Sequence, residues 1–79
     1  MITPAQCRAA RALINWSQLE LATAARVGVV TVRQFEIGAA EPRNATADAI
    51  ERALIGAGVI FVPENGEGPG VRLKKDRPE

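Results

Sequence analysis

The stretch SQLELATAARVGVVTVRQFEIG, residues 17–38, decides the fold of this 79-residue chain. It opens on a capping box, in which Ser17 and Glu20 use their side chains to satisfy free backbone N–H groups at a helix start. Apolar residues at helical spacing follow, with Leu19 and Ala22 on the expected buried side, and Gly28 interrupts them. The stretch therefore predicts two short helices joined by a tight turn.

The second half of this stretch is open to two interpretations. The β-branched run VVTV at residues 29–32 suits a strand by propensity. However, Val32, Phe35 and Glu36 fall on one face of a helix, and Gly38 is a suitable C-terminal stop. We therefore predict a helix over residues 29–37.

Two further helices flank this pair. A second capping box, TPAQ at residues 3–6, has proline at the first helical position and predicts a helix over residues 4–14. A fourth helix is predicted from about Asn44 to Ala57, between a breaker at Pro42 and a stop at Gly58.

Beyond Gly58 the pattern changes to that of a β-hairpin. Residues 59–62 (VIFV) and 71–74 (VRLK) read as strands around a turn region rich in glycine, glutamate and proline. If the four helices bury their apolar faces on each other, the hairpin has no place on the domain, and an isolated hairpin is marginal in water. We expect it to pair with the hairpin of a second copy through Val59, Ile60, Phe61, Val62, Val71 and Leu73.

The chain is accordingly divided into three parts: a helical domain at residues 1–58, a dimerisation hairpin at 59–75 and a frayed tail at 76–79. Its composition, 47% hydrophobic and 24% charged, fits one small globular domain. With one cysteine and no histidine, we expect no catalysis, cofactor, metal cluster or disulfide. Because apolar runs are short and no signal-peptide pattern is present, we expect a soluble, cytoplasmic protein with no membrane partner.

The sequence resembles the xenobiotic-response-element and phage-repressor class of helix-turn-helix domains, the Cro and lambda-repressor type. The resemblance rests on WSQLELA at 16–22, TVRQFEIG at 31–38, Pro42 and the helix at 45–54. Alpha-proteobacterial members of the class often end in a segment much like GVIFVPENG at 58–66. The resemblance implies a mainly α fold, a four-helix lambda-repressor-like DNA-binding domain followed by a C-terminal β-hairpin.

The same resemblance implies where DNA binds. The helix at 29–37 would enter the major groove, with base contacts from Val29, Val30, Arg33 and Gln34. Arg33 can pair with guanine and Gln34 with adenine, whereas the two valines offer only apolar contact, most simply to a thymine methyl group. The implied phosphate contacts are Ser17, Gln18, Arg26, Thr31 and Arg43.

Two further features belong to the resemblance. Glu36 matches a position whose carboxylate pairs with an arginine of the first helix, here Arg11, in a structural ion pair. Arg26 stands where the turn of the family usually has glycine.

The alternative for Arg33 and Gln34 is a solvated helix face. A similar alternative holds for the basic cluster of Arg72, Lys74 and Lys75, which is either a solvated strand or a minor DNA contact.

The expected function is that of a sequence-specific DNA-binding transcriptional regulator. We expect a dimeric repressor that binds an inverted-repeat operator, so its partners are double-stranded DNA and a second copy of the chain. The alternative is an antitoxin-like protein-interaction module of a toxin–antitoxin pair, with a regulatory protein as a further partner.

Overall fold

The computed structural model describes residues 1–39 and 43–75, which form four helices and a two-stranded antiparallel sheet. The predicted fold, mainly helical with a C-terminal hairpin, is confirmed. The predicted breaker at Pro42 and the predicted tail at 76–79 lie outside the described residues. Among the described residues no helix is both long and apolar enough to cross a membrane. The elements are α1 (Pro4–Ile14), α2 (Gln18–Ala25), α3 (Val29–Ile37), α4 (Asn44–Gly56), β1 (Val59–Val62) and β2 (Gly70–Leu73).

Both predicted capping boxes are confirmed. At the start of α1, Oγ1 of Thr3 accepts from the backbone N–H of Gln6 at 3.0 Å, and the amide oxygen of Gln6 accepts from the N–H of Thr3 at 2.9 Å. Ser17 and Glu20 make the same pair of bonds at the start of α2, at 3.0 and 2.8 Å. These bonds satisfy N–H groups that have no partner inside the helix, which is why each helix begins where it does.

The valine-rich segment is a helix, as predicted. Its strand propensity is overridden because the helical conformation buries Val32, Phe35 and Glu36 together on one face of α3. The expectation that Leu19 is buried is wrong, since its side chain is 63% exposed. The α2 helix turns Leu21 inward, and Leu19 lies two residues earlier, about 200° around the helix axis.

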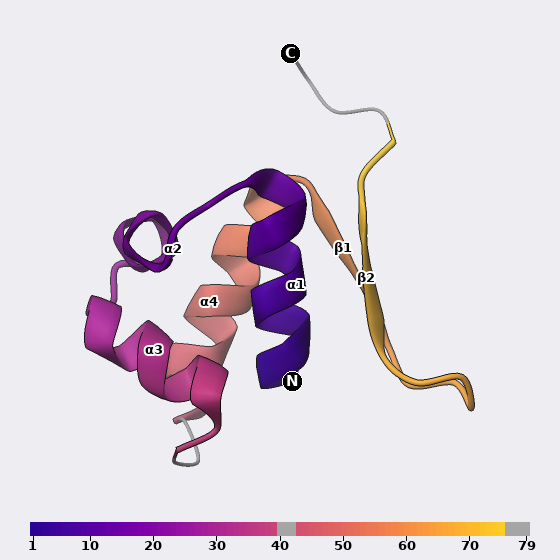
Figure 1. Ribbon diagram of the computed structural model, residues 1–79, viewed down its shortest axis with the longest axis horizontal. Helices are drawn as coiled ribbons and strands as arrows, with labels where there is room; N and C mark the ends of the chain where they lie inside the picture. Colours follow the sequence, from indigo (N-terminus) through magenta and orange to yellow (C-terminus); the bar gives the residue numbers. More distant parts are fainter. Residues whose placement is uncertain (40–42, 76–79) are drawn as a thin grey trace.

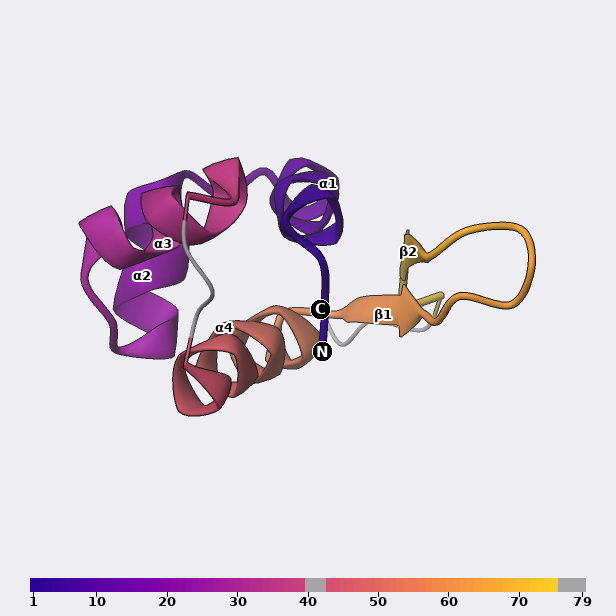
Figure 2. The same ribbon diagram turned by 90° about the horizontal axis from the view of Figure 1, so that it is seen from below.

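The helices and the hairpin are spread along the long axis of the molecule. Figures 1 and 2 show α2 and α3 at one end, the hairpin at the other, and α1 and α4 between them. The core lies where these elements meet, and its largest fully buried apolar side chains come from α2, α3, α4 and β1: Leu21, Val32, Ile50, Leu54 and Val59.

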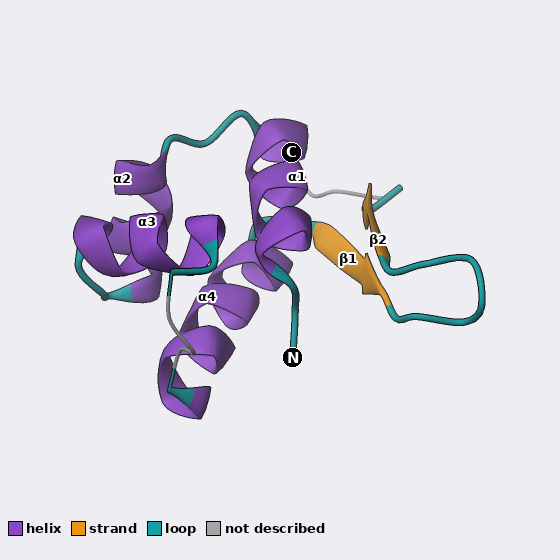
Figure 3. Cartoon of the chain, turned by 60° about the horizontal axis from the view of Figure 1, so that its bottom comes forward, coloured by secondary structure: helices purple, strands orange, loops and turns teal. Residues whose placement is uncertain are grey.

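The hairpin has a place on the domain, which corrects the expectation that the helices leave it without one. Val59 is 2% exposed and belongs to the core, and Phe61 and Val71 pack against that core. The amide nitrogen of Gln6 also donates to the carbonyl oxygens of Val62 and Gly70, at 3.3 and 2.9 Å. One side chain of α1 therefore binds both strands, and only the hairpin loop extends away from the helices (Figure 3).

Candidate nucleic-acid interface

The exposed face of α3 carries the candidate interface. At 100° per residue, Val30, Arg33, Gln34 and Ile37 fall within an arc of about 100°, and all four are exposed. The α3 helix lies at the end of the molecule opposite the hairpin (Figure 1). We call these four residues the reading face.

The structure brings three of the four expected base-contact residues onto the reading face. Val29, the first residue of α3, is the exception, because it is partly buried and packs against the core. Ile37 lies on the same exposed face, although it is not among the residues that were expected to contact bases. Its spacing of seven residues from Val30 is the signal that could have found it, since that spacing returns to the same helix face.

A network of hydrogen bonds around Glu36 holds α3 in place. The Arg11 guanidinium donates to both oxygens of the Glu36 carboxylate, through Nε to Oε2 at 2.6 Å and through Nη2 to Oε1 at 2.8 Å. Gln18 donates its amide N–H to Oε1 at 2.9 Å, and the thiol of Cys7 donates to Oε2 at 3.2 Å. Arg8 donates to the backbone oxygen of Glu36. The network thus ties α3 to α1 and to the first residue of α2.

Glu36 is 1% exposed, yet its environment favours the charged carboxylate. Burial by itself raises the pKa of this group, but hydrogen bonds from Arg11, Gln18 and Cys7, with the charge of Arg11, outweigh burial and lower the pKa below its ordinary 4.5. Arg11 and Glu36 therefore form a charged pair, in which the carboxylate is buried and the guanidinium is partly exposed. The resemblance implied this structural ion pair.

Cys7 lies inside this network and is fully buried. Burial, together with the hydrogen bond to Glu36, raises the pKa of its thiol. The group therefore stays protonated at neutral pH and acts as a hydrogen-bond donor, not as a nucleophile.

The residues expected to contact phosphates differ in exposure. Ser17, Arg26, Thr31 and Arg43 are exposed. The side chain of Gln18, in contrast, is partly buried and engaged with Glu36. Arg26 adopts φ 60°, the left-handed conformation that favours the glycine usual at this turn.

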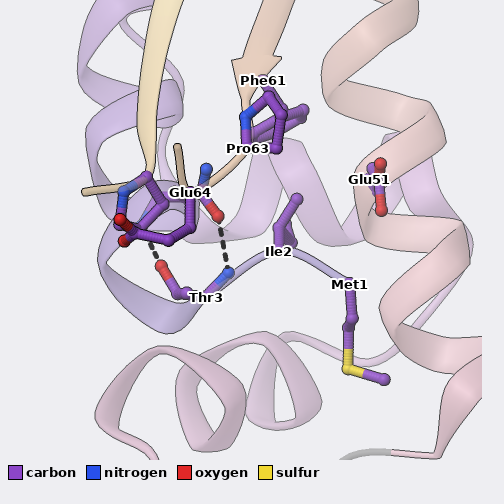
Figure 4. A pocket seen from close by; sticks show the side chains of 9 residues that line it. Met1, Ile2, Thr3, Glu51, Phe61, Pro63 and Glu64 are labelled. Atoms are coloured by element: carbon purple, nitrogen blue, oxygen red, sulfur yellow. Dashed lines mark hydrogen bonds between the residues drawn. The ribbon is translucent and has the colours of Figure 1, made fainter. Parts of the chain in front are cut away.

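A groove of about 570 Å³ lies away from the reading face, between the N-terminus, α4 and the hairpin. Met1, Ile2, Phe61 and Pro63 line it, and Glu51 and Glu64 stand on opposite sides of it in Figure 4. In the described part of the chain, no group of three or more side chains of the kinds that bind metals comes together.

The chain matches the model of a known protein family. The model of a helix-turn-helix family, of the xenobiotic-response-element and lambda-repressor type, matches residues 8–55, well over half of the chain. The matched segment begins in α1 and ends in α4, and it contains the whole reading face and, apart from Cys7, its supporting network. No curated protein matches the chain.

Proposed function

Because this chain belongs to the helix-turn-helix family of DNA-binding transcriptional regulators, we propose that it is a sequence-specific repressor that binds an inverted-repeat operator as a homodimer. The observation that carries the proposal is the reading face, where Arg33 and Gln34 are exposed on a helix whose opposite face packs into the core. A helix presented in this way fits the major groove of DNA.

Base reading rests on the two polar side chains at the centre of the face. The guanidinium of Arg33 can donate two hydrogen bonds to guanine, and the carboxamide of Gln34 can both donate to and accept from adenine. Each such pair discriminates against a wrong base by about 1–3 kcal/mol. This role is supported by the Glu36 network, whose hydrogen bonds connect α3 to α1 and α2 and so fix the position from which the two side chains extend.

Phosphate binding rests on the start of α2 and on exposed arginines. The hydroxyl of Ser17 accepts from Glu20 and keeps a proton to donate, and the first backbone N–H groups of α2 have no partner within the helix. Since the Gln18 side chain is engaged with Glu36, we assign its phosphate contact to its backbone N–H. Arg26, Thr31 and Arg43 supply the remaining contacts.

Dimerisation rests on the part of the hairpin that the protomer leaves free. Val59, Phe61 and Val71 pack within the protomer. The exposed side chain of Ile60 and, as far as residues 1–39 and 43–75 show, the outer edges of the two-stranded sheet are left for a partner. A two-fold axis through the hairpins would relate the two α3 helices by the same symmetry that relates the half-sites of an inverted repeat. We expect Ile60→Lys to yield monomers in sedimentation velocity, and dimers at an unchanged concentration would refute this arrangement.

Selection of bound sites from random duplex DNA tests the proposed function. Arg33→Ala should relax the preference at one position, whereas Arg43→Ala should weaken all sequences alike and lower the slope of log affinity against log salt by about 1. Arg52→Ala removes another exposed arginine, from α4, and serves as the control. Failure to select any sequence, or an unchanged preference in Arg33→Ala, would overturn the proposal.

A further inference from the structure

The reading face is apolar at both of its ends. Val30 is 55% exposed and Ile37 is 67% exposed, and both belong to the small set of large apolar side chains that the described residues leave in water. They flank Arg33 and Gln34 in sequence and share their arc of the helix. Going along α3, the face therefore presents an apolar group, a guanidinium, a carboxamide and a second apolar group.

The spacing of these groups matches that of base pairs. Seven residues of α-helix separate Val30 from Ile37, which is about 10 Å along the axis. Three base-pair steps of B-DNA, at 3.4 Å each, rise about the same length along the duplex axis, so a helix inclined to that axis spans at most about three steps. A helix lying along the groove can thus contact one base pair near each end and the pairs between them.

The mixed character of the face favours DNA over a protein as the partner of the two apolar groups. A dry protein surface that buried Val30 and Ile37 would also bury the guanidinium and the carboxamide between them, and an unpaired buried charge is strongly unfavourable. In the major groove the polar groups find acceptors and donors on base edges. The apolar feature that a base presents there is the methyl group on C5 of a pyrimidine.

We propose that α3 reads the C5-methyl groups of two pyrimidines, one with Val30 and one with Ile37, on either side of the base pairs contacted by Arg33 and Gln34. The inference rests on the proposed DNA-binding function and adds the chemistry of the half-site to it. Thymine and 5-methylcytosine carry the same methyl group at the same place, so either base satisfies the geometry.

Removal of single methyl groups from the DNA tests the inference. In a duplex that contains the selected operator, each thymine is replaced in turn by deoxyuridine, and each cytosine in turn by 5-methylcytosine. A buried methyl group corresponds to about a fourfold change in affinity. We expect a loss of this size at two thymine positions about three base pairs apart, or a matching gain where methylation of a cytosine supplies the group.

Matched variants assign each methyl group to a side chain. Val30→Ala should abolish the sensitivity at one position and Ile37→Ala at the other, while Leu13→Ala, an exposed apolar residue of α1, should leave both unchanged. Sequence-selective binding without any methyl effect, or a methyl effect that persists in both alanine variants, would overturn the inference alone. Absence of any selected operator would overturn the proposed function and this inference with it.

Discussion

Replacement of Arg11 by methionine should invert the pH dependence that Glu36 contributes to stability. In the wild type the folded pKa of Glu36 lies below its ordinary 4.5, so its contribution is present above that pH and is lost as the pH falls through the folded pKa. Without the guanidinium, burial becomes the dominant influence and raises the folded pKa above 4.5. The unpaired buried carboxylate then destabilises the variant at neutral pH, and the variant regains stability on acidification because this carboxylate takes up a proton.

The size of the effect follows from the geometry. Arg11 supplies two of the four hydrogen bonds to a carboxylate that is almost fully buried. Loss of one partner of a buried pair destabilises by about 3–5 kcal/mol, and we expect the lower value because the Arg11 side chain is 20% exposed. A domain of this length has a free energy of unfolding of about 4–12 kcal/mol, so the loss is a large fraction of the total.

Urea unfolding between pH 4 and pH 7 measures the effect, with the fluorescence of the one tryptophan, Trp16, as the signal. We expect Arg11→Met to lie about 3 kcal/mol below the wild type at pH 7. The gap should narrow as the pH falls toward 4.5, because the carboxylate that has lost its partner takes up a proton. Arg8→Met is the matched control, because Arg8 donates to the backbone oxygen of Glu36 and not to its carboxylate. The control should keep the pH profile of the wild type.

A double variant separates the buried charge from the lost packing. Arg11→Met with Glu36→Leu removes the orphaned carboxylate and should recover most of the stability lost by the single variant. The reasoning is refuted if Arg11→Met loses less than about 1 kcal/mol at pH 7, or if its gap to the wild type stays constant with pH.

Three further predictions concern the turn, the start of α2 and the hairpin. Arg26→Gly should raise the free energy of unfolding by up to about 1 kcal/mol, because glycine adopts φ 60° without strain; no gain in thermal melting would contradict a strained turn. Glu20→Gln keeps the capping box and removes a negative charge beside the proposed phosphate contact, so DNA affinity at low salt should rise severalfold with unchanged stability. An affinity that does not change would place α2 away from the DNA backbone. Gln6→Glu also keeps its capping box, but it replaces the amide N–H that donates to Val62 and Gly70 by a carboxylate, which can only accept. The free energy of unfolding should fall by about 2–3 kcal/mol at pH 7, and the hairpin amides should exchange hydrogen faster. Exchange at the wild-type rate would show that Gln6 does not hold the hairpin.

The local features of this protein were predictable because they depend on neighbours three or four residues apart. Thr3 with Gln6, and Ser17 with Glu20, specify the starts of α1 and α2 through bonds within one turn of helix. Gly38 ends α3 for the same local reason, because glycine readily takes the left-handed conformation. The burial of Val32, Phe35 and Glu36 followed from helical periodicity alone.

The pairing of Arg11 with Glu36 came from the resemblance to a family, and the other hydrogen bonds to Glu36 were predicted neither by the resemblance nor by local patterns. No spacing in the chain indicates that Gln18 and Cys7 also donate to Glu36, since these contacts require α1, α2 and α3 to be packed together. The exposure of Leu19 has the same origin, because the identity of the buried side of α2 depends on which residues its neighbours cover.

The sequence alone determined the four helices and the two strands, since hydrogen bonds and side-chain periodicity within each segment suffice to specify them. The predicted ends differ by one residue in two places, because α4 ends at Gly56 and β2 covers Gly70–Leu73. Only the tertiary structure decided where the hairpin lies, because Gln6 reaches carbonyl groups 56 and 64 residues further along the chain. It also decided which valine faces the core, leaving Val30 and Ile37 in water and Val29 packed at the edge. The periodicity of the sequence predicts which residues share a face of a helix. How much of each face is buried depends on how the other elements pack against it.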